Sequence, residues 1–330
     1  MDSDFVEDKK MTEKIQNEIV EAAVKGLMNT PKSLPSWLFY DEAGDKIFQE
    51  IMEMPDYYLT NCELAILKTY KGHILEILKK ETSHIKLIEL GAGDGTKTEI
   101  LLEHFLKNKL DFEYNPVDIS AAVLEQLETR LLNNLPHLQI QSKNHRFKDA
   151  FLEMRSNHQD RKFVLFMGAN IGNFSPEDAQ LFVNQISRQL NQGDFLMVGF
   201  DLKKSPRIIQ KAYDDPHGIT SRFNLNLLQR LNNDLEANFN LDQFEHYSYY
   251  DIASGASKSY LVSKIEQKVS LKAIDLEVTF NKAEYIHTEV SQKYDMEMIG
   301  KLAEIANLSI HSSYFDSDNY FADILFRKLS

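Results

Sequence analysis

Cysteine is almost absent from the sequence, because Cys62 is the only one in 330 residues. A single cysteine excludes an internal disulfide and a zinc site built from several cysteines. Proline and glycine are also scarce, with 8 and 13 residues, which argues against long disordered linkers. The sequence has no apolar run of the roughly 18 residues that a membrane-spanning helix needs, so we expect no membrane partner.

Basic residues are outnumbered by acidic ones, 37 to 50, and the formal net charge is -13. Proteins that hold nucleic-acid backbones need clustered cations, so we expect no nucleic-acid partner and a small-molecule substrate instead. The stretch Met1–Lys10 is polar and acidic, without the apolar core of a secretory signal. This stretch and the lone cysteine both favour a cytoplasmic location.

The middle of the chain alternates between short apolar strands and amphipathic helices. The predicted strands are Ile85–Leu90, Phe112–Asp118, Leu138–Lys143, Phe163–Met167 and Phe195–Phe200. The predicted helices are Thr98–Lys107, Ala121–Leu132 with Ser120 as its cap, and a third that starts after Ser175 and runs to Leu190. This alternation predicts an α/β fold, with a parallel Rossmann-like sheet covered by helices on both faces.

Two further regions suggest how the chain is divided. The segment 201–291 is richer in Asn, Tyr and Phe, and its strand candidates Tyr260–Ile265 and Ala273–Phe280 alternate in polarity. The tail returns to the earlier pattern, with a helix at Met296–Ala306 and a hairpin of Leu308–Phe315 and Tyr320–Phe326 to close the sheet edge. We therefore predict a sheet domain of residues 61–200 and 292–330, and a second α+β lobe of residues 1–60 and 201–291.

The sharpest local signal is a strand that passes through Glu89 into the turn Gly91-Ala-Gly-Asp-Gly95 and then into a helix. Glycines allow a tight turn and close approach to a ligand, and the following helix start offers free N–H groups. Asp118 ends the next strand, where a carboxylate can accept the ribose hydroxyls of an adenosine. Asp149 and Ala150 follow the third strand, where an acid can reach an adenine amino group. The alternative is a plain tight turn with Asp118 as a helix cap, but it leaves these coincidences at strand ends unexplained.

The glycine turn is not the dinucleotide fingerprint G-x-G-x-x-G, because Thr96 stands where that pattern places its third glycine. Its form resembles that of class I S-adenosylmethionine (SAM) methyltransferases. Further segments resemble one family within that class, the histidine Nα-methyltransferases of ergothioneine biosynthesis (EgtD family), over almost the whole chain. These segments are Pro31–Asp41, Met54–Thr60, Gly168–Phe174, Ala212–Asp215, Phe223–Asn224, Phe244–His246 and Thr288–Ser291.

The resemblance implies triple methylation of the α-amine of L-histidine to hercynine (histidine betaine), with S-adenosylhomocysteine as the second product, no metal, and a monomeric enzyme. The implied catalytic residues are Tyr40 and Asn173. The implied substrate-binding residues are Tyr57, Gly168, Asn173, Tyr213, Glu289 and Ser291. The implied SAM-binding residues are Glu89, Gly91, Gly93, Lys97, Asp118, Asp149 and Ala150. Aromatic faces attract cations, which suits tyrosines beside a quaternary ammonium product.

Other interpretations stay open on the sequence alone. The same chemistry on another aromatic amino acid, tyrosine or tryptophan, would use the same sheet and turn. A SAM-binding protein without catalysis is a third possibility. Taken one at a time, Tyr57 reads as a core aromatic, Asn173 as a helix cap and Glu289 as a solvated strand residue.

Overall fold

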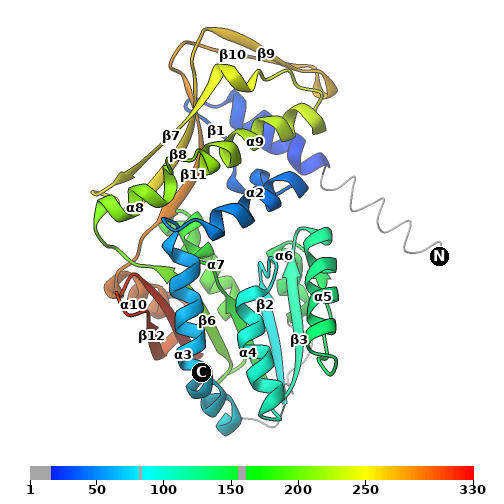
Figure 1. Cartoon of the computed structure of the whole chain (residues 1–330), viewed down its shortest axis with the longest axis vertical. Coiled ribbons are helices and arrows are strands. Elements are labelled where there is room, and N and C mark those ends of the chain that lie inside the picture. The colour runs from blue at the N-terminus through cyan, green and yellow to red at the C-terminus, as the bar shows by residue number, and fades with distance from the viewer. Residues whose placement is uncertain (1–15, 82–83, 155–160) are drawn as a thin grey trace, which may run out of the picture. The chain divides into compact units, whose positions relative to one another are not determined.

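The computed structural model describes residues 16–81, 84–154 and 161–330 (Figure 1). The stretch Met1–Lys10, on which the prediction about a secretory signal rests, lies outside these ranges. The chain divides into two compact units. Unit 1 comprises Met1–Tyr57 and Pro206–Val290, and unit 2 comprises Tyr58–Ser205 and Ser291–Ser330.

Unit 2 is built on a seven-stranded sheet in the order β12-β13-β6-β5-β2-β3-β4. Its strands are β2 (His84–Leu90), β3 (Asp111–Asp118), β4 (Lys143–Asn144), β5 (Arg161–Phe166), β6 (Phe195–Asp201), β12 (Leu308–Phe315) and β13 (Phe321–Lys328). The strands from β2 to β6 pair in parallel, while β13 pairs antiparallel with both β6 and β12. The predicted parallel sheet and its closing hairpin are therefore confirmed.

Helices bury both faces of this sheet, as the predicted α/β fold requires (Figure 1). The helices of unit 2 are α3 (Tyr58–Glu81), α4 (Thr96–Lys107), α5 (Ala121–Asn134), α6 (Phe147–Met154), α7 (Pro176–Ser187) and α10 (Met296–Ile305). Val164 and Val198 pack in one apolar cluster with residues of α6, α7 and α10. Their strand neighbours Phe163, Leu165 and Met197 point to the opposite face and are equally buried. The strands are apolar throughout because neither face meets water.

The helix starts follow the sequence signals. Ser175 caps α7, since its Oγ accepts the N–H of Asp178 at 3.1 Å and Pro176 takes the first helical position. Ser120 caps α5 by accepting the N–H of Val123 at 3.3 Å. Both predicted caps are confirmed.

The predicted third strand, Leu138–Lys143, is wrong in extent. Only Lys143–Asn144 form β4, and Ile140 makes a single parallel bridge to Tyr114. β4 is the edge of the sheet, where a strand finds a partner on one side alone. The Asn144 side chain donates to the carbonyl oxygens of Asp118 and Ile119 at 3.1 and 2.9 Å, beside the last paired residue of β4.

Unit 1 combines helices with a mainly antiparallel sheet. It contains a helix over residues 16–28, η1 (Ser36–Phe39), α2 (Glu42–Glu53), α8 (Pro206–Tyr213) and α9 (Ile219–Asp234). Its four-stranded sheet has the order β1-β11-β8-β7, with β1 (Lys32–Ser33), β11 (Tyr285–Gln292), β8 (Ala256–Ser263) and β7 (Phe244–Asp251). A second pair joins β9 (Gln267–Leu271) to β10 (Leu276–Phe280). Buried residues of α9 and the sheet, among them Phe223, Leu227 and Leu261, form its core.

Two strands predicted in this unit begin elsewhere. The candidate Tyr260–Ile265 belongs to β8, which starts at Ala256 and ends at Ser263. In the candidate Ala273–Phe280, the first residues form a short 3-10 turn that ends at Asp275, whose φ is +50°, and the strand begins only at Leu276. Alternating polarity marks the strand but carries no information about such a turn.

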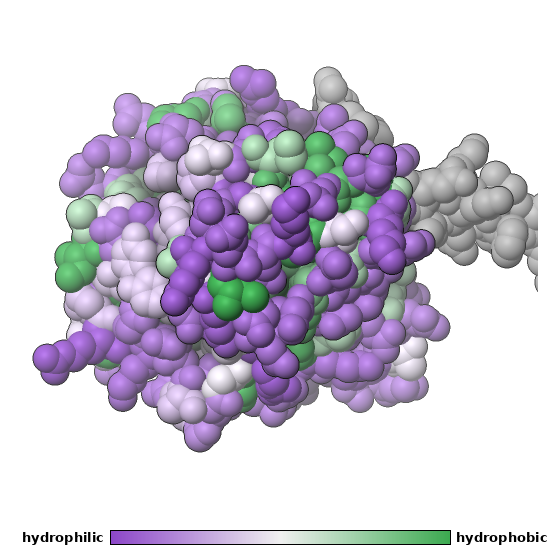
Figure 2. Space-filling model, turned by 90° about the horizontal axis from the view of Figure 1, so that it is seen from above, coloured by the Kyte–Doolittle hydropathy of each residue, from purple (hydrophilic) through white to green (hydrophobic). Residues whose placement is uncertain are grey.

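No helix in the described ranges is both long and apolar enough to span a bilayer. The face of the molecule in Figure 2 is covered mostly by hydrophilic residues, with hydrophobic ones in small groups. This distribution agrees with the many charged residues in the sequence.

Candidate functional site

The glycine turn between β2 and α4 takes a conformation that glycine enters without strain. Gly91, Gly93 and Gly95 have φ angles of +71°, +55° and +67°. The N–H of Gly91 donates to the carbonyl oxygen of Val117 at 2.8 Å, which ties the turn to the end of β3. A Cβ on Gly95 would lie 2.7 Å from Leu127 Cδ1 of α5, so a side chain there would collide with its neighbour. Glycine is needed here both for backbone shape and for close packing.

Asp118, the last residue of β3, faces the same turn. Its Oδ2 accepts the N–H of Gly93 at 2.9 Å, and its Oδ1 accepts the N–H of Ser120 at 3.0 Å. Burial raises the pKa of the Asp118 carboxyl above its ordinary value, against the opposing effect of these backbone donors. A carboxylate has about four acceptor positions, so the hydroxyls of a ligand can be accepted in addition to the backbone bonds.

The loop after β5 meets the glycine turn. Gly168 has a φ of +75°, and a Cβ on it would lie 3.4 Å from Lys97 Nζ and 3.5 Å from Asn170 Nδ2. A Cβ on Gly91 would likewise lie 3.5 Å from Asn170 Nδ2 and 3.7 Å from Cζ of Phe147. These loops therefore converge at the carboxyl ends of neighbouring parallel strands, where open α/β sheets bind ligands. Of these residues, sequence reasoning missed Asn170, although it lies inside a quoted motif, and Phe147.

A buried cluster of charges supports the Gly168 loop. Glu63 of α3 is fully buried; its Oε1 accepts the N–H of Gly168 at 2.7 Å, and its Oε2 accepts from Lys97 Nζ at 2.5 Å. Asp323 of β13 is equally buried, and neither of its oxygens has a hydrogen-bond partner in the described part of the chain. Burial and then the charge of Glu63 raise the pKa of Asp323 well above its ordinary value. The protonated acid is favoured, and its O–H can donate to Glu63.

Replacing Asp323 by asparagine is expected to stabilise the protein at pH 8 and to have little effect at pH 4. Because the pKa of Asp323 is higher in the folded than in the unfolded chain, the folded chain retains a proton that the unfolded chain has released. The free energy of unfolding of the wild type then falls as the pH rises from the pKa of Asp323 in the unfolded chain to its pKa in the folded chain. The fall is at most about 1.4 kcal/mol per pH unit. An asparagine amide donates to Glu63 without taking up a proton, so this loss disappears.

Urea unfolding at the two pH values measures the difference. Asp318→Asn, an exposed residue of the same hairpin, is the matched control and should leave the pH dependence unchanged. If the advantage of Asp323→Asn were the same at pH 4 and pH 8, the assignment of Asp323 as a buried neutral acid would be wrong.

Three other predicted cofactor residues lie near the same strand ends. Glu89 of β2 is buried, and its carboxylate accepts from Thr98 Oγ1 at 2.6 Å and from the hydroxyl of Tyr114. Burial raises the pKa of Glu89 to about 7. Asp149 is half-buried in the first turn of α6, and Ala150 beside it is buried. A contact between these three residues and a cofactor stays a prediction. Across the described ranges, no group of three or more His, Cys, Asp or Glu side chains is arranged to hold a metal ion.

In unit 1, the three predicted tyrosines belong to one aromatic group. Ring centroids are 5.6 Å apart for Tyr40 and Phe48, 6.3 Å for Phe48 and Tyr57, and 6.5 Å for Tyr57 and Tyr213, all in edge-to-face arrangements. Phe48 of α2 thus links two of the tyrosines, a role that its place in the sequence does not reveal. The group offers several ring faces with negative electrostatic potential, a surface suited to a cation.

Arg230 of α9 fixes the backbone that carries Tyr40. Its Nη1 donates to the carbonyl oxygens of Leu38 and Tyr40, each at 3.1 Å. These carbonyls end the short helix η1, whose last groups have no partner within the helix itself. A buried guanidinium therefore holds Tyr40 in place, although 190 residues separate the two.

The end of β11 carries two more of the predicted substrate residues. Glu289 is half-buried and accepts from Ser259 Oγ of β8 at 3.2 Å. Ser291 is buried, and its Oγ accepts from Lys293 Nζ at 2.8 Å. Alternate residues of a strand face the same side, which places Glu289 and Ser291 on one face of β11.

Asn173 is brought to this strand end within unit 2. It is the last residue of η2 (Asn170–Asn173), the 3-10 turn that follows Gly168. A Cβ on Gly172 would lie 2.9 Å from the carbonyl oxygen of Gln292 and 3.5 Å from Ser291 Oγ. The Asn173 turn therefore packs closely against the end of β11, which sequence order alone does not imply.

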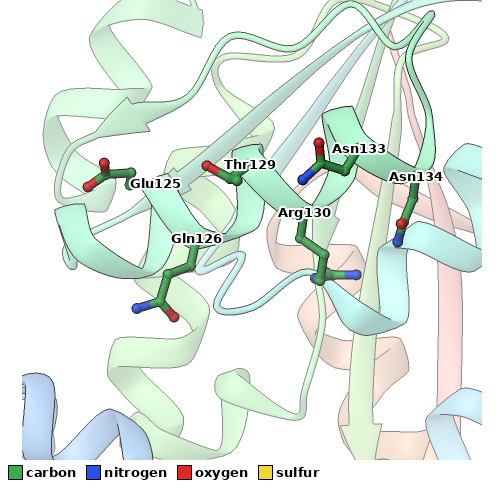
Figure 3. Close-up of a pocket in the computed structure, with 6 residues that line it drawn as sticks. All are labelled: Glu125, Gln126, Thr129, Arg130, Asn133 and Asn134. Carbon is green, nitrogen blue, oxygen red and sulfur yellow. The ribbon is translucent and has the colours of Figure 1, made fainter.

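The surface depression in Figure 3 lies apart from these groups. It is lined by residues of α5, namely Glu125, Gln126, Thr129, Arg130, Asn133 and Asn134. Arg130 points from α5 to the glycine turn, pairs with Glu99 and donates to the carbonyl oxygen of Asp94 at 2.5 Å. Arg130 thereby ties α5 to the glycine turn.

The sequence matches, over residues 19–328, the family described as "Histidine-specific methyltransferase, SAM-dependent". It is 33% identical over 286 residues to the histidine N-alpha-methyltransferase of Mycobacterium tuberculosis, covering 87% of each chain. It is 33% identical over 293 residues to the enzyme of the same name from Mycolicibacterium smegmatis, covering 89% of each. The ergothioneine biosynthesis protein 1 of Schizosaccharomyces pombe is 34% identical over 242 residues, which cover 72% of this chain and 31% of that protein.

Proposed function

Because this chain belongs to the family of SAM-dependent, histidine-specific methyltransferases, we propose that it methylates the α-amine of L-histidine. Three transfers give hercynine, a step of ergothioneine biosynthesis. The observation that carries the proposal is the convergence in unit 2 of the glycine turn, Asp118 and the Gly168 loop at adjacent strand ends. Unit 2 is then the SAM-binding unit, and unit 1 recognises the amino acid.

The residues of unit 2 fit SAM. Gly91 leaves an open cradle beside Asn170, which a Cβ would narrow, and Asp118 presents a carboxylate for the ribose hydroxyls. Asp149 would reach the adenine amino group, and Lys97, held by Glu63, would face the polar end of the molecule. When bound, SAM supplies a methyl group on a positively charged sulfur.

The chain contributes positioning more than acid–base chemistry. Asn173 and Tyr213 would hold the carboxylate of histidine and orient its amine, with Tyr40 beside the amine. Aligning a nucleophile with its target can lower a barrier by several kcal/mol. The amine must react through its neutral form, so it has to lose a proton before each transfer. After three transfers the same rings, including Phe48 and Tyr57, would stabilise the trimethylammonium group, by about 0.5–2 kcal/mol each.

Specificity for histidine would come from β11. Glu289 would accept an imidazole N–H, while Ser291 and Tyr57 would make further contacts with the ring. A phenol O–H and an indole N–H are also donors, but they lie at other distances from the amino-acid backbone, so neither meets Glu289 where an imidazole N–H does. Glu289 therefore favours histidine over tyrosine and tryptophan as the substrate.

Mass spectrometry of products tests the proposal. With SAM and histidine we expect mono-, di- and trimethylated histidine, and little product from tyrosine or tryptophan. Glu289→Ala should reduce the preference for histidine by about 10- to 100-fold, the worth of a hydrogen bond to a charged group. Glu277→Ala, an exposed glutamate of the same unit, is the control. Product from tyrosine or tryptophan alone would establish the alternative substrate, and no product from any of the three would indicate a non-catalytic SAM-binding protein.

A further inference from the structure

Lys293 is a fully buried lysine just beyond β11. Its Nζ lies 2.8 Å from Asp201 Oδ2 and 2.8 Å from Ser291 Oγ. Both side chains of the Lys293–Asp201 pair are fully shielded from solvent. Burying an ammonium group costs free energy unless the group is paired and hydrogen-bonded. We therefore expect Lys293 to do more than fill space in the core.

The Lys293–Ser291 hydrogen bond has a defined direction. An ammonium group has three donors and no acceptor, so Ser291 Oγ accepts in this bond. A serine hydroxyl has one proton, which points away from the donor that the oxygen is accepting. Toward any other partner, Ser291 is thereby biased to donate.

We propose that Lys293 is a positioning residue that keeps the Ser291 hydroxyl as a hydrogen-bond donor and so selects the neutral imidazole of histidine. The inference rests on the proposed contact between Ser291 and the imidazole ring. A neutral imidazole has one N–H and one acceptor nitrogen, whereas an imidazolium has two N–H groups. Ser291 would donate to the acceptor nitrogen, and Glu289 on the same face of β11 would accept the N–H.

Asp201 is itself held from several elements. Tyr58 of α3 donates its hydroxyl to both Asp201 oxygens at 2.9 Å, and Lys204 pairs with the same carboxylate. Burial lowers the pKa of Lys204. The charged and titratable groups around Lys293 and Ser291 include Asp201, Lys204 and Tyr58, with Glu289 and His287 on the strand; burial lowers the pKa of His287.

The proposal predicts how histidine binding depends on pH. Calorimetry of L-histidine with S-adenosylhomocysteine present, at pH 7.5 and 5.5, should show about tenfold weaker binding at pH 5.5, because most imidazole is then protonated. A carboxylate alone would act in the opposite direction, since Glu289 favours an imidazolium. Wild-type affinity that is unchanged or tighter at pH 5.5 would overturn the proposal without any variant.

Two variants separate this inference from the proposed function. Ser291→Ala retains every titratable group named above, so its difference from wild type reports the serine alone; the loss at pH 5.5 should shrink to less than about threefold. Lys293→Met should bind histidine about three- to tenfold more weakly at pH 7.5, the range for one hydrogen bond, and show the same reduced pH dependence. Lys203→Met, an exposed lysine paired with Asp295 at 2.7 Å, should match wild type.

The outcomes are distinct. If Ser291→Ala binds histidine like wild type at both pH values, the proposed Ser291 contact fails. If Ser291→Ala loses most of the pH dependence of histidine binding but Lys293→Met keeps it at tenfold, the contact between Ser291 and the imidazole stands. The role of Lys293 is then overturned. If Lys293→Met does not fold, as circular dichroism would show, the pH dependence of wild type and Ser291→Ala still decides whether Ser291 acts as a donor.

Discussion

An Asp118→Asn protein is expected to bind SAM at least about a hundredfold more weakly than wild type. The carboxylate of Asp118 is proposed to accept two ribose hydroxyls, and hydrogen bonds to a charged group are worth about 1.5–3 kcal/mol each. It also accepts the N–H groups of Gly93 and Ser120. An asparagine has one acceptor oxygen in place of two, so its NH₂ must face a backbone donor, and the shape of the glycine turn is disturbed as well.

Calorimetric titration with SAM or S-adenosylhomocysteine measures this loss. Asp111→Asn is the matched control, because Asp111 is the first residue of β3 and Asp118 is the last, and Asp111 is exposed. Thermal unfolding of both proteins checks that the sheet is intact. An Asp118→Asn protein that binds SAM within about threefold of wild type would show that the ribose contact is misassigned.

A Glu63→Gln protein is expected to lose about a hundredfold or more in kcat/KM for SAM. Glu63 bridges Lys97 and the backbone N–H of Gly168, and it is fully buried. Removing the charged partner of a buried ion pair costs about 3–5 kcal/mol. A glutamine can accept from Gly168 or from Lys97 but not from both, because its NH₂ opposes the other donor. Either the Lys97 side chain or the Gly168 loop would then lose its hydrogen bond to residue 63 and shift.

Initial rates at varied SAM concentration measure the change. Glu76→Gln lies on the same helix, α3, with its side chain exposed, and should behave like wild type. The KM for histidine at saturating SAM shows whether the loss lies in SAM binding or in histidine binding. If Glu63→Gln retained full activity and SAM affinity, the charge cluster would be a feature of stability alone.

Much of unit 2 follows from local sequence. The apolar strands are short and bounded by caps and turns, so the alternation of β2 to β6 with helices is read from periodicity and from residues such as Ser120 and Ser175. The positions of Gly91 and Asp118 at adjacent strand ends follow as well, because parallel strands that follow one another usually lie side by side. The edge strand β4 is shorter than its sequence predicts, since its length depends on having one partner and not on its own composition.

The supporting groups of the site have no comparable local signal. Glu63 meets Gly168 and Lys97 only because α3 packs against the sheet, and Asp323 arrives from the closing hairpin. Phe48 joins Tyr40 to Tyr57 through the packing of α2. The charged partners are tens to hundreds of residues apart, and each residue of either group alone reads as an ordinary charged or apolar residue.

By itself the sequence determined the sheet, the glycine turn and the family, because these depend on short-range periodicity, backbone conformations that glycine alone takes easily, and matching segments along the chain. The tertiary structure decided which charges share a buried environment. It paired Glu63 with Lys97 and Lys293 with Asp201, and so gave direction to the hydrogen bonds that reach Gly168 and Ser291. The physical reason is that the energy of a charge depends on burial and on its nearest partners, and both exist only once distant segments have packed together.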